Sequence, residues 1–396
     1  MSTPTPSRPD AESGLDVPPG LAGVRVVETA IGEVRGSEGL LSYRGLDATR
    51  LARERTFEEV AHLLLTGHLP GAAEHAAFAA ELTSARELPE PVAEALPVIA
   101  RASAGRPLEG VRSALSIAAP LLGAAPWQDQ DPEAQRAVAA RLIGVTPSLV
   151  AGLHRLARGL APIAADPARG LANDYLRQLT GRDPDDTAAA ALERYLSIVA
   201  EHGLNASTFA ARLVTSTGAD LGAAVTAAAG ALSGPLHGGA PGRALEFLDA
   251  AHDIDDAERR AREAVARGDR IMGFGHRVYR TADPRARLLR ETAEELGGQR
   301  VRFAHEVEER VVATLAELKP GRELHANVEL YAAVVMERVG VPAELFTPTF
   351  TIGRMAGWCA HALEQAGTNR LIRPSAAYVG PSPGVAEHSD DLHAPA

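Results

Sequence analysis

Apolar residues recur every three or four positions along most of the chain, which is the period of an amphipathic helix. The pattern is clear in "TFEEVAHLLLTGHLP", where Thr56 and Glu59 form a predicted capping box and Pro70 closes the segment. Further helical patterns follow, separated by the breakers "LPEP", "GRP" and "APWQDQDPEAQ". One early stretch, "VRVVETAIGEVRGSEGLLSYRG", mixes β-branched residues with glycine and predicts a few short strands or turns. The sequence therefore predicts an all-α fold.

The middle of the chain divides into an Ala- and Gly-rich region and a more charged one. Residues 185–232 predict helices with small side chains, which pack closely within a subunit or across a dimer. The pattern ends in "SGPLHGGAPG", where Gly234 and Pro235 break the helix. Residues 243–318 carry charged helical patterns such as "DAERRAREAVARG" and predict a smaller domain inserted into a larger one. Core-like sequence resumes with "ELFTPTFTIGRMAGWCAHALEQ".

Composition narrows the class of protein. A chain of 396 residues, 45% of them hydrophobic, can bury a large core in one large or two unequal domains. Its formal net charge of −11 disfavours a nucleic-acid partner and an anionic membrane surface. Apart from Lys319, its strongly basic residues are arginines, whose guanidinium groups bind carboxylates and phosphates through two hydrogen bonds.

Cysteine content and the amino terminus bear on the compartment. The single cysteine, Cys359, excludes an internal disulfide framework and a Cys-rich zinc site, and it indicates a reducing compartment. The stretch "MSTPTPSRPDAESGLDVPPG" lacks the basic and apolar parts of a signal peptide and predicts a disordered tail of roughly twenty residues. We expect no later stretch to be long and apolar enough to span a bilayer. These features predict a cytoplasmic protein.

Four histidines lie beside a helix breaker, a glycine or an acid. They are His202 in "AEHGLNAST", His237 in "GPLHGGAPG", His276 in "GFGHRVYR" and His325 in "LHANVELY". A single histidine of this kind is more often a hydrogen-bonded structural residue. The glycines around His237 and His276 favour a binding site, because they allow the backbone to approach a ligand and point amide donors at it.

Spacing excludes several other chemistries. The histidines lack the i, i+4 spacing of a helical zinc motif, and His305–Glu306 has no second histidine, so we expect no bound metal. The chain contains no G-x-S-x-G motif, and Cys359 lies within a predicted helix, which argues against a hydrolase nucleophile. The segment "GFGHRV" lacks the third glycine of a dinucleotide fingerprint and follows no predicted strand.

Two arginines and one acid stand apart from the solvated charges. Arg285 follows Asp283–Pro284 at a predicted helix start, and Arg354 lies in an apolar run where a lone guanidinium needs an anion as its partner. A dicarboxylate ligand would meet this need. Glu329 lies in the first turn of an apolar helix capped by Asn327. From the residues alone, Glu329 is first interpreted as an acid that interacts with the helix dipole, and a general base is the functional alternative.

Together, these segments resemble the citrate synthase family. The resemblance rests on "GPLHGGA", on "IMGFGHRVY" followed by "DPR", on "NVELY", on "IGRMAGW" and on "IRPSAAYVG", and it covers Gly20 to Gly380. It implies an almost entirely α-helical homodimer with shared active sites that condenses acetyl-CoA with oxaloacetate, giving citrate and free CoA. Acyl-CoA is then a co-substrate and no permanent cofactor is expected. The implied domains are a tail at 1–20, a large helical domain at 21–236 and 345–396, and a small helical domain at 237–344.

The resemblance also implies roles for individual residues. His237 would hydrogen-bond the thioester oxygen, His276 would polarise the ketone of oxaloacetate and protonate the new alkoxide, and Glu329 would remove the α-proton. The oxaloacetate-binding residues implied are His202, Arg285, Arg354 and, from the partner subunit, Arg373. The CoA-binding residues implied are Gly273, Phe274, Gly275 and Arg280.

Three departures from the family pattern affect the expected activity. Glu329 stands where the family commonly has Asp, and an extra methylene moves a carboxylate by on the order of 1 Å. "GGAP" replaces a frequent "GGAN", and Val199 stands where a histidine is often found. Two alternatives therefore accompany the citrate synthase hypothesis: a 2-methylcitrate synthase that uses propionyl-CoA, and a non-catalytic protein that binds oxaloacetate and CoA.

Overall fold

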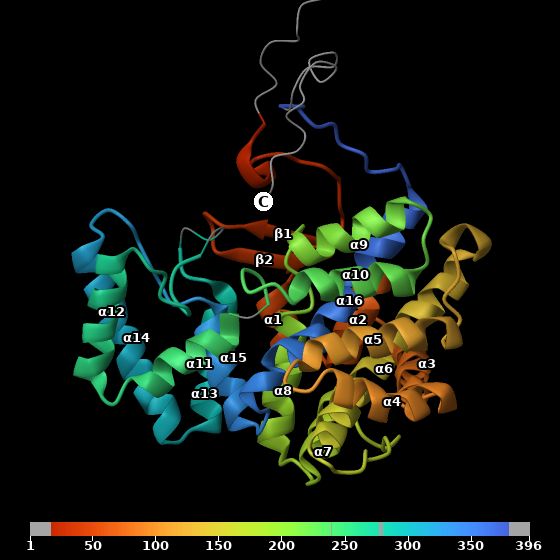
Figure 1. Ribbon diagram of the computed structural model, residues 1–396, viewed down its shortest axis with the longest axis horizontal. Helices are drawn as coiled ribbons and strands as arrows, with labels where there is room; N and C mark the ends of the chain where they lie inside the picture. The colour runs from red at the N-terminus through yellow and green to blue at the C-terminus, as the bar shows by residue number, and fades with distance from the viewer. Residues whose placement is uncertain (1–16, 239, 277–278, 280, 380–396) are drawn as a thin grey trace, which may run out of the picture. The chain divides into compact units, whose positions relative to one another are not determined.

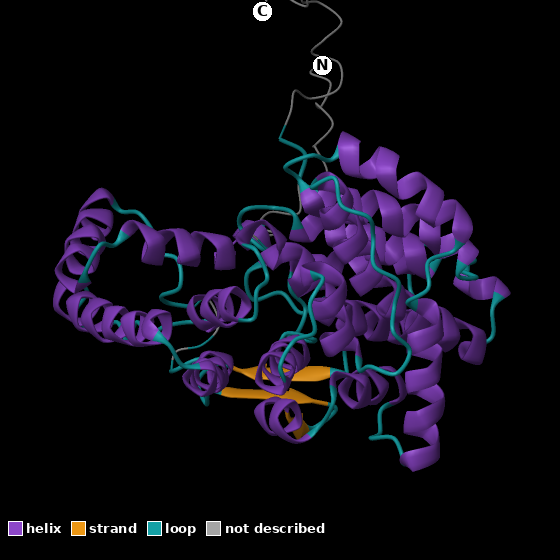
Figure 2. Cartoon of the chain, turned by 90° about the horizontal axis from the view of Figure 1, so that it is seen from below, coloured by secondary structure: helices purple, strands orange, loops and turns teal. Residues whose placement is uncertain are grey.

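Residues 17–238, 240–276, 279 and 281–379 are described in the computed structural model. Residues 29–371 form one compact unit, and residues 17–28 and 372–379 belong to a second. Within these ranges the chain forms sixteen α-helices and one three-stranded sheet (Figures 1 and 2). The predicted all-α fold class is confirmed.

The elements follow one another with short connections. The helices up to residue 198 are α1 (Ala48–Glu54), α2 (Phe57–Thr66), α3 (Ala72–Ala85), α4 (Glu90–Ala102), α5 (Pro107–Leu121), α6 (Pro132–Ala157), α7 (Leu171–Thr180) and α8 (Asp186–Ile198). The later helices are α9 (Ala206–Ser216), α10 (Leu221–Leu232), α11 (Ala240–Ala250), α12 (Ile254–Arg267), α13 (Pro284–Leu296), α14 (Gln299–Leu318), α15 (Val328–Arg338) and α16 (Phe346–Gly367). Single 3-10 turns are η1 (Pro19–Leu21), η2 (Trp127–Asp129) and η3 (Ala343–Leu345).

The start of α2 shows how local sequence sets an element. The Thr56 hydroxyl accepts the Glu59 amide at 3.2 Å, and the Glu59 carboxylate accepts the Thr56 amide at 2.9 Å, so the predicted capping box forms. Such a cap is worth about 1 kcal/mol. The helix ends at Thr66, before the predicted stop at Pro70, because Gly67 adopts φ 90° and turns the chain.

The short strands lie where the sequence predicted strands or turns. β1 (Gly32–Arg35), β2 (Leu40–Tyr43) and β3 (Leu46–Asp47) form an antiparallel sheet in chain order, drawn in orange in Figure 2. The phenol of Tyr43 donates to the carbonyl of Ile198 at 2.8 Å. This bond ties the sheet to the end of α8, just before His202.

Helices α6 and α16 form the centre of the larger unit. α16 packs against α2, α6, α8, α9 and α10, and α6 packs against α3, α4, α5 and α7. By length and composition α6 could cross a membrane, so the expectation that no stretch reaches that length and apolarity is wrong. Because 83% of its most apolar window is buried inside the protein, α6 matches the core helix of a soluble protein.

Helices α11 to α15 pack mainly on one another. α12 lies against α14, and α15 lies against both α11 and α13, as the neighbouring ribbons in Figure 1 show. Ion pairs such as Arg262 with Glu317 and Arg310 with Glu258 join α12 to α14. This group meets the rest of the unit largely through α8. The separate small helical domain at 237–344 stays a prediction.

The terminal segments are described by themselves. Pro19–Leu21 forms a 3-10 turn, so the end of the predicted disordered tail has structure. The rest of that prediction, at residues 1–16, lies outside the described residues. Residues 372–379 form neither helix nor strand, and Arg373 is exposed there.

Candidate active site

The loop that carries His276 is held by the segment before α15. Gly273 and Gly275 have φ of 90° and 76°, a backbone region that glycine enters without strain. The amide of Asn327 donates to the Gly273 carbonyl at 2.9 Å, and its side chain donates to the Gly275 carbonyl at 2.8 Å. These bonds bring His276 close to the start of the helix that carries Glu329.

The carboxylate of Asp283 hydrogen-bonds the starts of α13 and α15 and also the side chain of Arg285. Its carboxylate accepts the backbone amide of Arg285 at 3.0 Å, as the cap of α13, and the amide of Val328 at 3.1 Å, at the start of α15. The same carboxylate receives both Nε and Nη2 of Arg285, at 3.0 and 2.8 Å. Burial opposes the charge, but Arg285 keeps the pKa of Asp283 below its usual range. Sequence reasoning singled out Arg285 and missed its counter-ion.

The position of the His276 proton follows from a backbone hydrogen bond. The Tyr279 amide lies 3.0 Å from Nδ1 and Nη2 of Arg285 lies 3.2 Å from Nε2; both groups can only donate, and a neutral ring accepts at one nitrogen only. The shorter backbone contact assigns the acceptor to Nδ1 and the proton to Nε2. Burial, helped by Arg285, lowers the pKa of His276 to about 4, so the ring is neutral near pH 7. Nε2 lies 3.2 Å from Nη2 of Arg285. Because both groups are donors, an oxygen placed beside them would receive two hydrogen bonds.

His202 and Tyr279 extend this group. Nε2 of His202 lies 3.2 Å from the Tyr279 hydroxyl, and the rings of His202 and His276 meet edge to face with centroids 5.7 Å apart. Burial lowers the pKa of His202 well below its usual value, with further contributions from Arg285 and Arg354. His202 is thus a neutral donor or acceptor among cations. Tyr279, in the "GHRVY" segment, was not predicted.

Arg354 is buried in α16, where the sequence predicted a guanidinium in need of an anion. Its Nε donates to the Val199 carbonyl at 2.7 Å, and its guanidinium lies over the Phe350 ring, 4.6 Å from the centroid. Burial lowers the pKa of Arg354, and repulsion from Arg285 acts in the same direction. Two guanidinium groups whose charges repel in a buried space favour the binding of an anion between them.

A buried chain of polar residues, missed by sequence reasoning, supports the His202 loop. Nε of Arg212 donates to Nδ1 of His361 at 2.9 Å, so Nε2 is the ring nitrogen that carries the proton, 3.2 Å from Glu201. Burial opposes the charge of Glu201, but His361 and Arg354 keep its pKa below the usual value. The Glu201 carboxylate also accepts the Gly203 amide, which fixes the bend after His202.

His237 is oriented by residues at the start of α9. The Ser207 amide donates to Nε2 of His237 at 3.4 Å, and since an amide can only donate, the neutral ring carries its proton on Nδ1. The Ser207 hydroxyl lies 2.8 Å from the same Nε2 and accepts the indole N–H of Trp358 at 3.0 Å. Burial, then Arg354, lowers the pKa of His237 to about 4. His237 is therefore a neutral donor through Nδ1.

Glu329 lies in the first turn of α15, where the Asn327 side chain accepts its amide at 3.0 Å. Burial raises the pKa of Glu329 to about 7, and the nearby Arg285 only partly offsets this. An acid that merely answered the helix dipole would have a lowered pKa. The raised pKa is that of a carboxyl able to gain and lose a proton near neutrality.

The predicted residues divide into those that the structure connects and those that it does not. The charge of Arg285 acts on His202, His276 and Glu329, and the charge of Arg354 acts on His202 and His237, so all four of these predicted site residues are linked to the two arginines. The backbone of His325 accepts the Gly275 amide, and its ring faces Glu323. Arg280 lies outside the described residues, and Arg373 belongs to the terminal unit.

The fold and these side chains define a class of helical enzyme in which neutral imidazoles, a carboxyl with a pKa near neutrality and paired guanidinium groups act on an anionic carbonyl compound. The citrate synthase C-terminal domain model matches residues 20–375, and the chain belongs to the citrate synthase family. Its chemistry is that of a citrate synthase-type acyltransferase.

Individual relatives support this over nearly the whole chain. "Putative citrate synthase 2" of Mycobacterium tuberculosis is 41% identical over 378 residues, covering 94% of this chain and 95% of that protein. A 2-methylcitrate synthase of the same species is 38% identical over 384 residues, covering 96% and 94%. The ternary complex of Thermoplasma acidophilum citrate synthase with oxaloacetate and carboxymethyl coenzyme A matches with a TM-score of 0.84 at 28% identity, covering 93% of this chain and 97% of that one.

Proposed function

We propose that this chain condenses acetyl-CoA with oxaloacetate and water, giving citrate and free CoA. The observation that carries the proposal is Glu329, a buried carboxyl with a pKa of about 7 that lies within reach of the charge of Arg285. Glu329 removes a proton from the α-carbon of the thioester, while the Nδ1 proton of His237 hydrogen-bonds the enolate oxygen. The α-carbon then attacks the ketone carbon of oxaloacetate. Hydrolysis of the resulting thioester releases CoA.

His276, Arg285 and Arg354 bind and activate oxaloacetate. The Nε2 proton of His276 hydrogen-bonds the ketone oxygen and is transferred to it as the new alkoxide forms. Arg285 and Arg354 hold the two carboxylates of oxaloacetate, and His202 binds beside them. Arg373 would reach the site from the partner subunit. The backbone of Gly273, Phe274 and Gly275, together with Arg280, would contact CoA.

Propionyl-CoA is the second candidate acyl donor, and the 2-methylcitrate synthase among the relatives favours testing it. An apolar pocket discriminates one methylene by only about 1 to 3 kcal/mol, so both donors can react. We expect thiol release with oxaloacetate and either donor, with a higher kcat/KM for acetyl-CoA. A higher value for propionyl-CoA would assign the chain as a 2-methylcitrate synthase. Binding of oxaloacetate and CoA without thiol release would favour the non-catalytic alternative.

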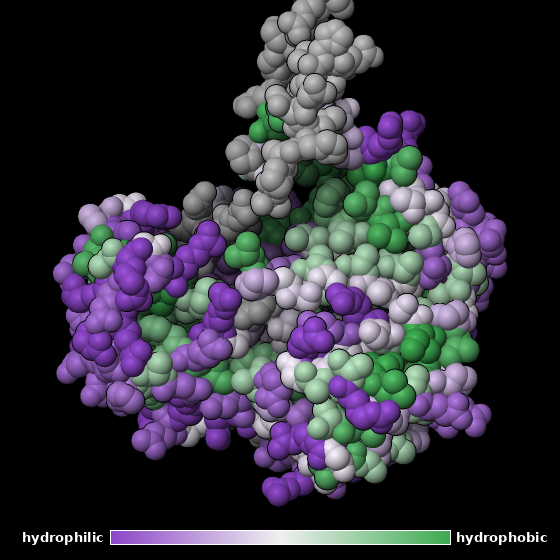
Figure 3. All heavy atoms as spheres, viewed as in Figure 1, coloured by the Kyte–Doolittle hydropathy of each residue, from purple (hydrophilic) through white to green (hydrophobic). Residues whose placement is uncertain are grey.

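We also propose a homodimer that forms through α9 and α10. Figure 3 shows apolar side chains gathered over these two helices, and their Ala- and Gly-rich sequence leaves a surface suited to close helix packing. Leu213 on α9 is 38% exposed there, and Leu121 at the end of the neighbouring α5 is 48% exposed. A second copy of the chain would cover these side chains.

Replacing Leu213 by glutamate tests the dimer. We expect light scattering to give twice the chain mass of 41.5 kDa for the unaltered protein and a shift toward the single-chain mass for Leu213→Glu. Thiol release should fall with it, since Arg373 would no longer reach a partner's site. Leu160→Glu, at a leucine that is 47% exposed outside α9 and α10, is the matched control. A single-chain mass for the unaltered protein would contradict the proposal.

A further inference from the structure

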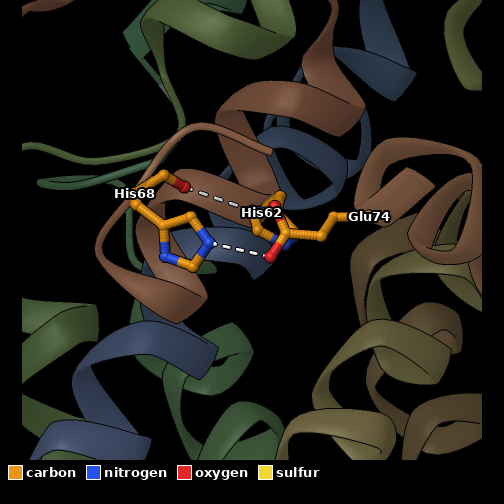
Figure 4. Close-up of side chains that lie close together, drawn as sticks. All are labelled: His62, His68 and Glu74. Atoms are coloured by element: carbon orange, nitrogen blue, oxygen red, sulfur yellow. Dashed lines mark hydrogen bonds and ion pairs between the residues drawn. The ribbon is translucent and has the colours of Figure 1, made fainter. Parts of the chain in front are cut away.

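The corner between α2 and α3 brings together two histidines and a glutamate that have no part in the proposed reaction. His62 lies in α2, His68 in the connection, and Glu74 in the first turn of α3 (Figure 4). Each side chain offers one ligand atom, and the three atoms lie within 4.8 Å of one another. Imidazole nitrogen and carboxylate oxygen are both ligands of zinc and of related divalent ions.

The buried member of the group, His62, is held in a defined protonation state. Its Nδ1 lies 3.2 Å from the carbonyl oxygen of His68. A carbonyl can only accept, so Nδ1 carries the proton and Nε2 carries the lone pair. The ring also meets Phe78 edge to face, with centroids 5.3 Å apart. A histidine that binds a metal usually donates its other ring N–H to a carbonyl or carboxylate in this way, because the bond fixes the ring and its tautomer.

His68 and Glu74 already face each other at a distance close to that of two ligands. Nε2 of His68 lies 3.1 Å from Oε1 of Glu74, and two ligands of one tetrahedral ion with bonds of about 2.1 Å lie about 3.4 Å apart. The other carboxylate oxygen accepts the Gly71 amide at 2.8 Å, which orients the group. Both side chains are more than half exposed, so each can move toward an ion without disturbing the core.

We propose that His62, His68 and Glu74 bind one divalent transition-metal ion of the zinc type. The ion replaces the proton shared by His68 and Glu74, and Nε2 of His62 completes three protein ligands, with water in the fourth position. The ion would link the end of α2 to the start of α3 across the turn at Gly67. The site is independent of the proposed reaction, because none of its ligands contributes to the oxaloacetate pocket.

The ligand spacing explains why sequence reasoning expected no metal. That expectation came from the i, i+4 histidine pair of a single helix. Here His68 follows His62 by six residues, and Glu74 follows His68 by six. Such spacing places ligands together only because the chain reverses between two helices.

Zinc titration of the full chain, after removal of metal with a chelator, tests the site. We expect one equivalent of Zn²⁺ to compete with a chromophoric chelator at micromolar concentration, and Co²⁺ to give the visible absorption of a tetrahedral complex. Zn²⁺ should also raise the melting temperature, since binding to the folded state alone stabilises it. Failure of the protein to withdraw zinc from the chelator would overturn the proposal.

Three variants identify the ligands. His68→Ala and Glu74→Gln should each weaken zinc binding by at least about tenfold, because each removes one of three protein ligands. The Gln amide oxygen can still accept the Gly71 amide, so Glu74→Gln leaves the helix cap in place. His252→Ala, at an exposed histidine outside the group, is the control and should bind zinc as the unaltered protein does. Equal affinity of His68→Ala and His252→Ala would show that the zinc lies elsewhere.

Discussion

Replacing Glu329 by glutamine should lower kcat by about 10²- to 10⁴-fold, the contribution of a positioned general base. Glutamine has nearly the same shape but cannot accept the α-proton. Thiol release from acetyl-CoA with oxaloacetate measures the loss, and binding of oxaloacetate should change little because Arg285 and Arg354 remain. A kcat that falls by less than about threefold would be a far smaller loss than removal of a general base causes, and it would show that Glu329 is not the base.

The pH dependence of the unaltered enzyme provides a second readout of the same group. Glu329 acts only as the carboxylate, and its pKa is raised to about 7, so kcat/KM should fall by about tenfold for each pH unit below 7. The Glu329→Gln variant should lack this decrease at low pH.

The free energy of unfolding should change with pH in the opposite direction to the rate. The folded state holds the Glu329 proton more tightly than the unfolded state does. Ionisation of Glu329 therefore destabilises the fold as the pH rises from the ordinary pKa of a glutamate toward 7. The variant should therefore be at least as stable at pH 8.

Glu329→Asp separates the position of the carboxylate from its charge. It introduces the residue that the family resemblance implies at this position, but it withdraws the carboxylate by on the order of 1 Å from where the longer side chain holds it. We expect kcat to lie between that of the unaltered protein and that of Glu329→Gln. The loss relative to the unaltered protein should be at most roughly a hundredfold. Such a result would mean that the surrounding backbone has adjusted to the longer side chain.

Local sequence predicted the elements well, because their signals lie within a few residues. Thr56 and Glu59 cap α2 as expected, and the error at its end came from Gly67, whose left-handed conformation stops the helix before Pro70. The long apolar α6 could not be assigned from composition alone. A core helix and a membrane helix have the same sequence pattern, and only packing against other helices distinguishes them.

The candidate site residues came from family motifs, whereas the long-range contacts that support them were not predicted. His276 and Arg285 lie in one motif, but the support of His202 depends on Glu201 and His361, which are 160 positions apart. Neither residue shows a local signal of its role, since an acid before a histidine and a histidine in an apolar helix are common. The raised pKa of Glu329 is also a product of burial, which the first turn of a helix does not reveal.

Replacing His276 by glutamine should lower kcat by about 10²- to 10⁴-fold through loss of proton transfer to the alkoxide. The glutamine amide can still donate a hydrogen bond toward the ketone oxygen, so the Kd for oxaloacetate should change far less than kcat. The thiol-release assay measures kcat, and protection of the protein against thermal unfolding by oxaloacetate measures binding. A large loss of binding with little change in kcat would assign His276 to positioning rather than to proton transfer.

Hydrogen exchange at the acyl group distinguishes the two steps. In deuterated water, with a four-carbon dicarboxylate that lacks the ketone, the unaltered enzyme should exchange the α-protons of acetyl-CoA without forming citrate. His276→Gln should retain this exchange, because Glu329 and His237 are intact, whereas Glu329→Gln should lose it. If both variants lost exchange equally, His276 would be needed to assemble the base, and its assignment to the ketone alone would be wrong. The opposite tautomers of the two histidines predict the first result, since each ring presents its proton to a different substrate.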